Sequence, residues 1–232
     1  MIWFYLDGQD SREHGLYLRN VPEILSAEPD IEFVHIPGRD GSLTQNHGGF
    51  KDQSIVMECY IKDVAHVGEA YGFMSGYHEL VISADMTRKY RATFYGAAEA
   101  VRVVRNMKAW EMSVPVKLKP FRYFEPEAEA LTVQASGSPV NNPGTAPAAP
   151  RITIAGNGDI TLMIGMYIME FEGVVNGIII DSDKRQLLTY DGTARALDQD
   201  IDEFPILVPG ANYIQWSGSI SSLTIEPRWR DR

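Results

Sequence analysis

The sequence predicts a mainly β fold in two parts, an N-terminal β-sandwich or barrel with one packed α-helix and a C-terminal β-sandwich. Short runs rich in Val, Ile, Tyr, Phe and Trp alternate with turn residues along most of the 232 residues. A single stretch breaks this pattern with helical spacing, and a proline-rich segment divides the chain. The hydrophobic content of 44% is sufficient for a packed core.

The first half, which we bound at residues 1–133, is expected to be built from strands. Its opening apolar run ends at Asp7-Gly8, a dipeptide that is typical of a tight turn. The later runs have the β-branched and aromatic composition of strands and are separated by turn residues. The predicted strands cover residues 2–6, 31–36, 54–61, 79–84, 90–95, 101–104 and 109–118.

One amphipathic helix is expected between residues 64 and 77. Apolar side chains recur there at steps of three or four residues, which places them on one face of a helix. Asp63 precedes them as a candidate N-cap. Gly68, Gly72 and Gly76 each weaken the helix by up to about 1 kcal/mol, so it requires packing against the sheet.

The boundary between the two parts is placed in residues 134–150. This segment contains four prolines, small residues and no charge, a composition that predicts an extended linker. A second, all-β domain is expected over residues 151–232. Glycine-rich residues 155–159 predict a hairpin turn between strands 151–154 and 160–164. Further strands are expected at residues 167–172, 177–181, 187–190, 203–208, 211–217 and 219–227.

Charge and hydropathy exclude several classes of protein. The net charge of -10 argues against nucleic acid as a partner. The basic stretch 102–108 alternates with apolar residues and predicts a solvated strand face. No apolar run approaches the roughly 20 residues of a membrane span, and the N-terminus has no evident secretory signal. We therefore expect a soluble protein that is made in a cytoplasm.

Residues that could carry chemistry do not form a recognisable catalytic or metal-binding pattern. Cys59, the single cysteine, lies in an apolar run and is expected to be a small buried hydrophobe. Ser75 lies near His78, but within the predicted helix rather than on a nucleophile elbow. The acidic run 198–203 lacks the glycine and distal glutamate of a calcium loop, and 181–184 is expected to be a polar turn. Neither an enzyme nor a cofactor is predicted.

Two stretches carry a family resemblance. The first is Ile-Pro-Gly-Arg-Asp-Gly-Ser-Leu at 36–43, followed by Gly48-Gly49-Phe50 and a strand around Ile55. The second runs from 141 to 152 and continues to Ile179-Ile180-Asp181-Ser182. In order and spacing they resemble the siphophage distal tail proteins, the Dit-like phage tail family. The second stretch is similar to the entry into the galectin-like C-terminal β-sandwich of that family.

This resemblance implies a structural virion protein that forms a homohexameric ring at the tip of a bacteriophage tail. The N-terminal domains would pair into a closed belt around a channel, with the galectin-like domains outside. The ring would join the tail-tube protein to the hub, fibre or receptor-binding proteins of the tail tip or baseplate. Assembly would take place in the bacterial host cytoplasm, without nucleic-acid binding or membrane insertion.

Candidate ring-interface residues lie in the first strand and in the turn-rich segment 38–50. They are Trp3, Tyr5, Arg39, Asp40 and Phe50. A ring built on them would remove exposed sheet edges, which otherwise promote aggregation. The alternative for Trp3 and Tyr5 is that both face the core.

Rival functions remain open from sequence. A carbohydrate-binding module at the tail tip could stack host cell-wall glycans on Tyr213 and Trp216, although aromatic residues of a sandwich more often belong to its core. A tail-tube protein shares the β-rich plan with a helix, but the second domain favours the distal tail interpretation. A tail-tip hydrolase would require a catalytic pair that the sequence does not show.

Overall fold

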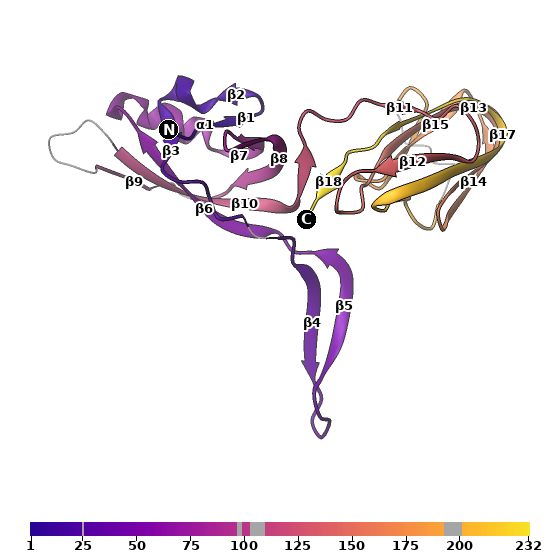
Figure 1. The fold of residues 1–232 in the computed structure, drawn as a ribbon, viewed down its shortest axis with the longest axis horizontal. Coiled ribbons are helices and arrows are strands. Elements are labelled where there is room, and N and C mark those ends of the chain that lie inside the picture. Colours follow the sequence, from indigo (N-terminus) through magenta and orange to yellow (C-terminus); the bar gives the residue numbers. More distant parts are fainter. Residues whose placement is uncertain (25, 97–98, 103–109, 193–200) are drawn as a thin grey trace. The chain divides into compact units, whose positions relative to one another are not determined.

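The computed structural model describes residues 1–24, 26–96, 99–102, 110–192 and 201–232 and divides into two compact units (Figure 1). The first unit comprises residues 1–125 together with Arg232, and the second comprises Pro126–Asp231. Both units consist mostly of strands, which confirms the predicted mainly β class. No helix in these described ranges is long and apolar enough to cross a membrane.

The first unit is built on one antiparallel sheet. Its strands pair in the order β2-β1-β7-β8-β10-β6-β3, and β9 flanks the first part of β10. The strands are β1 (Phe4–Leu6), β2 (Gln9–Asp10), β3 (Leu16–Leu18), β6 (Gln53–Ile61), β7 (Gly76–Ile82), β8 (Asp85–Phe94), β9 (Glu99–Arg102) and β10 (Trp110–Phe124). A short 3-10 helix, η1 (Ser11–His14), joins β2 to β3.

This sheet curls so that its last strand in the pairing order, β3, meets the residues just before β1. Ile2 forms a bridge with Leu18, whose N–H donates to the Ile2 carbonyl at 2.8 Å. The curled sheet thus has an inner face that holds the core, as expected for the predicted sandwich or barrel. Buried side chains alternate along each strand; the largest include Phe4, Leu6, Leu16, Met57, Ile61, Leu80, Met112 and Leu118.

Cys59 belongs to this core, as predicted. Its side chain is fully buried, and burial raises the pKa of the thiol to about 12. A thiol with so high a pKa is protonated at neutral pH and therefore unreactive.

The predicted helix is present but shorter than expected. A 3-10 turn, η2 (Val64–His66), precedes α1 (Val67–Phe73), and the Asp63 carboxylate accepts from the Ala65 N–H at 3.2 Å, as expected of an N-cap. The chain turns at Gly76, whose φ is +94°, and the next residue, Tyr77, lies in β7. The predicted helix to residue 77 was therefore too long: α1 ends at Phe73 with Met74 as its C-cap, and β7 begins at Gly76.

The segment after β3 forms a two-stranded sheet of its own, β4 (Pro29–His35) paired with β5 (Ser42–Phe50). The sequence predicted β4, but it did not predict β5, which was taken as part of a glycine-rich loop. Residues 42–49 of β5 are exposed on both faces, so the strand has no core side to impose hydrophobic alternation. We call this hairpin, residues 29–50, the arm.

The second unit is organised around two long strands, β13 (Arg151–Ile164) and β17 (Gly210–Glu226), which pair along most of their lengths. One half of this ribbon is flanked by β12 and β14, and the other half by β11, β15 and β16. The flanking strands are β11 (Leu131–Thr132), β12 (Ser138–Asn142), β14 (Tyr167–Val174), β15 (Gly177–Asp181) and β16 (Gln186–Thr189); β18 (Arg230–Asp231) follows β17.

Two predicted turns are bulges within these long strands. Residues 155–159 were expected to reverse the chain, and residues 211–217 and 219–227 were expected to be separate strands. Instead β13 and β17 run through, with register shifts between Ala155 and Gly156 and between Asn157 and Ile160. Glycine with a positive φ occurs in β-bulges as well as in turns. Bulges bend a two-stranded ribbon, so both halves of this ribbon can bury one face.

The predicted linker is part of the second unit. The unit begins at Pro126, not after residue 133, and within 134–150 the strand β12 pairs with β17. Ala146 and Ala148 are fully buried, and the buried Asn142 amide donates to two carbonyl oxygens. Prolines and small residues here fit close packing rather than flexibility, which composition alone does not distinguish.

Other sequence predictions have mixed outcomes. Residues 203–208 were expected to form a strand, but they contribute only an isolated bridge between Leu207 and Ala148. Residues 103–109 and 193–200 lie outside the described residues, and with them most of the predicted basic strand face at 102–108 and half of the acidic run at 198–203.

An ion pair anchors the end of β15 to the C-terminal segment of the second unit. The Asp181 carboxylate, whose side chain is 4% exposed, accepts two hydrogen bonds from Arg228 at 2.7 and 3.0 Å. Burial opposes the ionisation of Asp181, but the hydrogen bonds from Arg228 and the Lys184 N–H outweigh it and lower the pKa. The predicted polar turn at 181–184 therefore begins with a buried anion.

Replacing Gly218 with alanine is expected to destabilise the second unit more than replacing Gly137. Both glycines have positive φ angles, +97° and +88°, so each substitution carries a backbone cost of about 1 kcal/mol or more. Only at Gly218 would the new Cβ overlap a backbone atom, the Asp159 carbonyl oxygen. Urea unfolding of both variants measures the difference, and equal losses would contradict the bulge geometry.

Asp181→Asn is expected to lower the free energy of unfolding by about 3 kcal/mol at neutral pH, because it leaves a half-buried guanidinium without its anion. The lowered pKa means that Asp181 stabilises the fold above about pH 3.9, its ordinary value, and that this contribution is lost as pH falls through the folded value. The free energy of unfolding of Asp181→Asn should therefore fall less on acidification than that of the wild type, because the contribution of Asp181 is already absent. Asp183→Asn, 4.0 Å from Arg228 and more exposed, is the matched control.

Candidate assembly site

The arm is a sheet that pairs with no other described strand. An isolated two-stranded hairpin is marginally stable in water, because it has no third strand or packed layer to bury its side chains. β4 has 7 residues and spans roughly 20 Å at about 3.3 Å per residue. The arm is therefore long enough to contact another molecule at a distance from its own sheet.

Apolar side chains on the arm are exposed to solvent. The exposed fractions are 70% for Phe33, 42% for Leu43 and 37% for Ile36. Val34 and Leu43 form a cross-strand pair, while Phe33 pairs with Thr44 on the opposite face of the hairpin. Apolar residues gathered on an unsupported hairpin are typical of a surface that another molecule covers.

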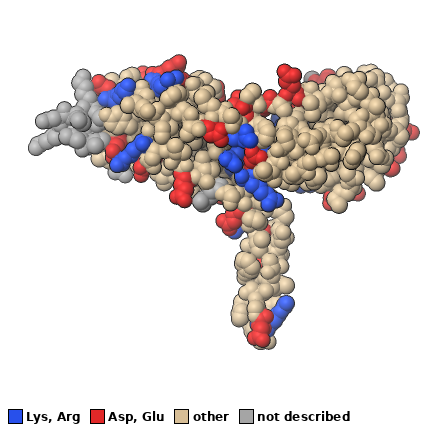
Figure 2. Space-filling model, in the orientation of Figure 1, with Lys and Arg blue, Asp and Glu red and all other residues tan. Residues whose placement is uncertain are grey.

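The tip of the arm carries Arg39 and Asp40 (Figure 2). Both residues are exposed, and the flanking Gly38 and Gly41 adopt φ angles of +82° and +76° that favour glycine in the turn. The Arg39 guanidinium forms no ion pair with any described residue. The tip thus presents a free basic side chain, at the position that the sequence predicted for an interface.

The remaining predicted interface residues contact their own chain. Phe50 packs edge-on against Phe121 with ring centroids 5.0 Å apart. Trp3 lies under the Arg12 guanidinium, 4.3 Å from the ring centroid. These two aromatic side chains are therefore only partly available to a neighbouring molecule.

Trp3 and Tyr5 flank the buried Phe4 on the first strand and lie on the face opposite the core. The alternative in which both face the core was therefore wrong. Tyr5 lines a pocket of about 300 Å³ in which Lys89, nearly buried, pairs with Glu79 at 2.8 Å.

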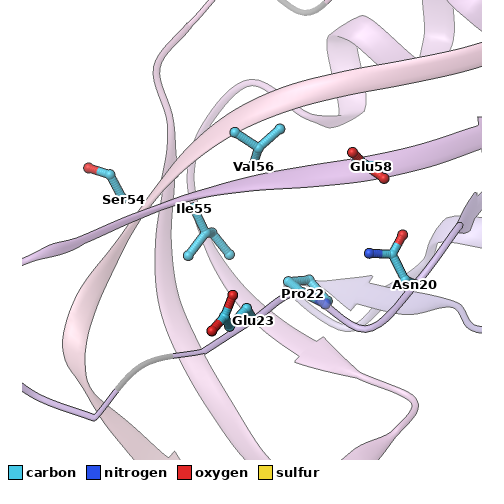
Figure 3. Close-up of a pocket in the computed structure, with 7 residues that line it drawn as sticks. All are labelled: Asn20, Pro22, Glu23, Ser54, Ile55, Val56 and Glu58. Carbon is cyan, nitrogen blue, oxygen red and sulfur yellow. The ribbon is translucent and has the colours of Figure 1, made fainter.

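A larger pocket of about 430 Å³ lies beside β6, where β3 has ended (Figure 3). On β6, Ile55 points toward the segment that holds Pro22 and Glu23, Val56 points away from it, and Glu58 contributes a carboxylate. The facing segment follows β3 and contributes Pro22 and Glu23. The full lining is Asn20, Pro22, Glu23, Ser54, Ile55, Val56 and Glu58.

The charged residues that line this pocket are both glutamates. Glu23 forms no ion pair with a described residue. Glu58 lies 4.0 Å from Arg19, but Arg19 lies nearer to Glu111, at 3.4 Å, so Glu58 is only partly compensated. The pocket combines apolar surface with a negative charge that Arg19 compensates only in part, a combination suited to a side chain with an aliphatic stem and a cationic end.

The two candidate sugar-stacking residues do not share a face. Both lie on β17, but Tyr213 alternates with the buried Asn212 and Ile214 and is 58% exposed. Trp216, three residues further on, has the opposite parity and is half-buried, and its backbone N–H donates to the Ser136 hydroxyl at 2.8 Å. One sugar ring cannot stack on both aromatic side chains.

Histidine and serine do not form a nucleophilic pair in the first unit. The His78 imidazole contacts the Asp7 carboxylate at 2.7 Å and the Ser75 backbone carbonyl, not its hydroxyl, at 2.8 Å. Burial opposes the ionisation of Asp7, but the Glu79 N–H and His78 lower its pKa. This contact ties the β1–β2 turn to the start of β7. Within the described ranges, no group of three or more His, Cys, Asp or Glu could hold a metal ion.

A curled β unit with a hairpin arm, followed by a second β unit, defines the fold class. The Dit protein (gp 19.1) of phage SPP1 has this fold; its structure is described as a paradigm of the hub adsorption apparatus in phages that infect Gram-positive bacteria. The two structures have a TM-score of 0.74 and 14% sequence identity over 97% of this chain and 98% of that chain. The resemblance predicted from sequence is confirmed for the fold. No protein-family model and no curated protein matches the chain.

Sequence reasoning found the tip of the arm but missed the residues around it. Phe33 was predicted only as a strand residue; its exposure follows from the pairing with the polar Thr44 of β5, a strand that sequence reasoning did not predict. The pocket was not predicted, because Glu23 and Glu58 lie far apart in the sequence and only the pairing of β3 with β6 brings them together.

Proposed function

We propose that this chain is a non-enzymatic structural protein of a phage tail, a distal tail protein that assembles into a hexameric ring at the tail tip. The arm is the observation that carries the proposal. Its ladder pairs with no other described strand, and Phe33, Ile36 and Leu43 are exposed in the single chain. The likeness to a tail hub protein in fold supports the same class.

In the proposed ring, each arm packs on the next copy of the first unit. A head-to-tail contact of this kind uses two different surfaces of the same chain and closes into a ring when its rotation permits. Each contact should bury more than about 1,000 Å² to persist. Trp3, Tyr5, Arg39, Asp40 and Phe50 remain the candidate contact residues, joined now by Phe33.

The two faces of such a ring would meet different proteins. We assign the tail-tube protein to one face and the hub, fibre or receptor-binding proteins of the tail tip to the other, with assembly in the host cytoplasm. A tail-tube function is less well supported, because the chain continues from its curled sheet into a second complete β unit.

Replacing Phe33 with serine should reduce the mass of the purified particle without unfolding the subunit. At 70% exposure the side chain contributes little to the fold of a single chain, so the free energy of unfolding should change by less than about 0.5 kcal/mol. In the ring the same side chain would be buried by a neighbour, and its loss should weaken each contact. Light scattering at several protein concentrations measures the mass.

Met166→Ser is the matched control, because Met166 is 83% exposed in the second unit, which is outside the proposed belt. It should leave the mass unchanged. A single-subunit mass for the wild-type protein at every concentration would overturn the proposed function. An unchanged mass for Phe33→Ser would remove the arm from the interface.

A further inference from the structure

We propose that the pocket beside β6 receives Arg39 from the arm of a second copy of this chain. The inference rests on the proposed ring and names the two surfaces that would meet in it. The donor is the basic side chain at the tip of the arm, and the acceptor is the pair of carboxylates of Glu23 and Glu58.

Charge complementarity identifies the occupant. Arg39 is exposed and forms no ion pair with a described residue, while the charged residues of the pocket lining are both acidic. Lys117, opposite Ser54 across the β6–β10 pair, does not belong to the lining. A guanidinium binds carboxylates with fixed, often bidentate, hydrogen bonds.

The shape of the pocket fits the same side chain. Its volume of about 430 Å³ is far larger than the roughly 30 Å³ that a water molecule occupies. Pro22 and Ile55 offer apolar surface for the aliphatic stem of arginine, and Glu23 and Glu58 belong to the same lining and offer carboxylates for its charged end.

The arm of the same chain cannot supply this arginine. β4 begins six residues after Glu23, and its ladder with β5 holds Arg39 at the far end of a hairpin roughly 20 Å long. Folding back would require that ladder to break. The contact must therefore be made between copies, and it is head-to-tail because donor and acceptor are different surfaces.

Charge reversal tests the pairing, because two defective variants should complement each other. Arg39→Glu would place a carboxylate against the native pocket, and Glu58→Arg would place a guanidinium against the native arm. Each variant alone should raise the protein concentration required for half-assembly at least about tenfold. An equimolar mixture should assemble nearly as the wild type does, because every contact in an alternating ring of the two chains is then attractive.

Light scattering gives the mass, and thermal melting of each variant shows that the subunit remains folded. Lys184→Glu, an exposed reversal in the second unit, controls for the change in net charge. If Glu58→Arg fails to fold, Glu23→Arg takes its place.

The outcomes separate the two proposals. Variants that assemble alone as the wild type does, or that fail to complement when mixed, would overturn the pocket assignment while a wild-type ring stands. A wild-type protein that never assembles would overturn the ring itself.

Discussion

A two-stranded β-hairpin without a third strand or a packed layer is only marginally stable in water, and the arm pairs with no other strand among the described residues. The curled sheet of the first unit joins its two ends at the bridge between Ile2 and Leu18 and keeps its core inside. The arm lies outside that closure, and in the proposed ring a neighbouring copy would cover it.

The two ends of such a contact differ in chemistry. The arm offers exposed apolar side chains and a free arginine at its tip, while the pocket beside β6 offers an apolar wall and two glutamates. The pocket exists because β3 stops at Leu18 and leaves the first part of β6 without that neighbour. Because β3 is short, the first part of β6 is left as an open surface on which a neighbouring molecule can pack.

The longer strands of the curled sheet could be predicted from the sequence because one buried face imposes alternation on them, as it does on β10, whereas the short strands β2 and β3 were not predicted. β5 could not, because both its faces are exposed and no alternation is imposed. Gly158 and Gly218 signal a positive φ, but that angle serves a hairpin turn and a bulge alike. Of the candidate site, only the tip of the arm was accessible to sequence reasoning; the pocket depends on strand pairing.

Negative-stain imaging of the purified wild-type protein tests most directly whether the first unit closes into a ring with copies of itself. Particles with six-fold symmetry and an open centre are expected. Compact single subunits, or closed dimers without a channel, would contradict it.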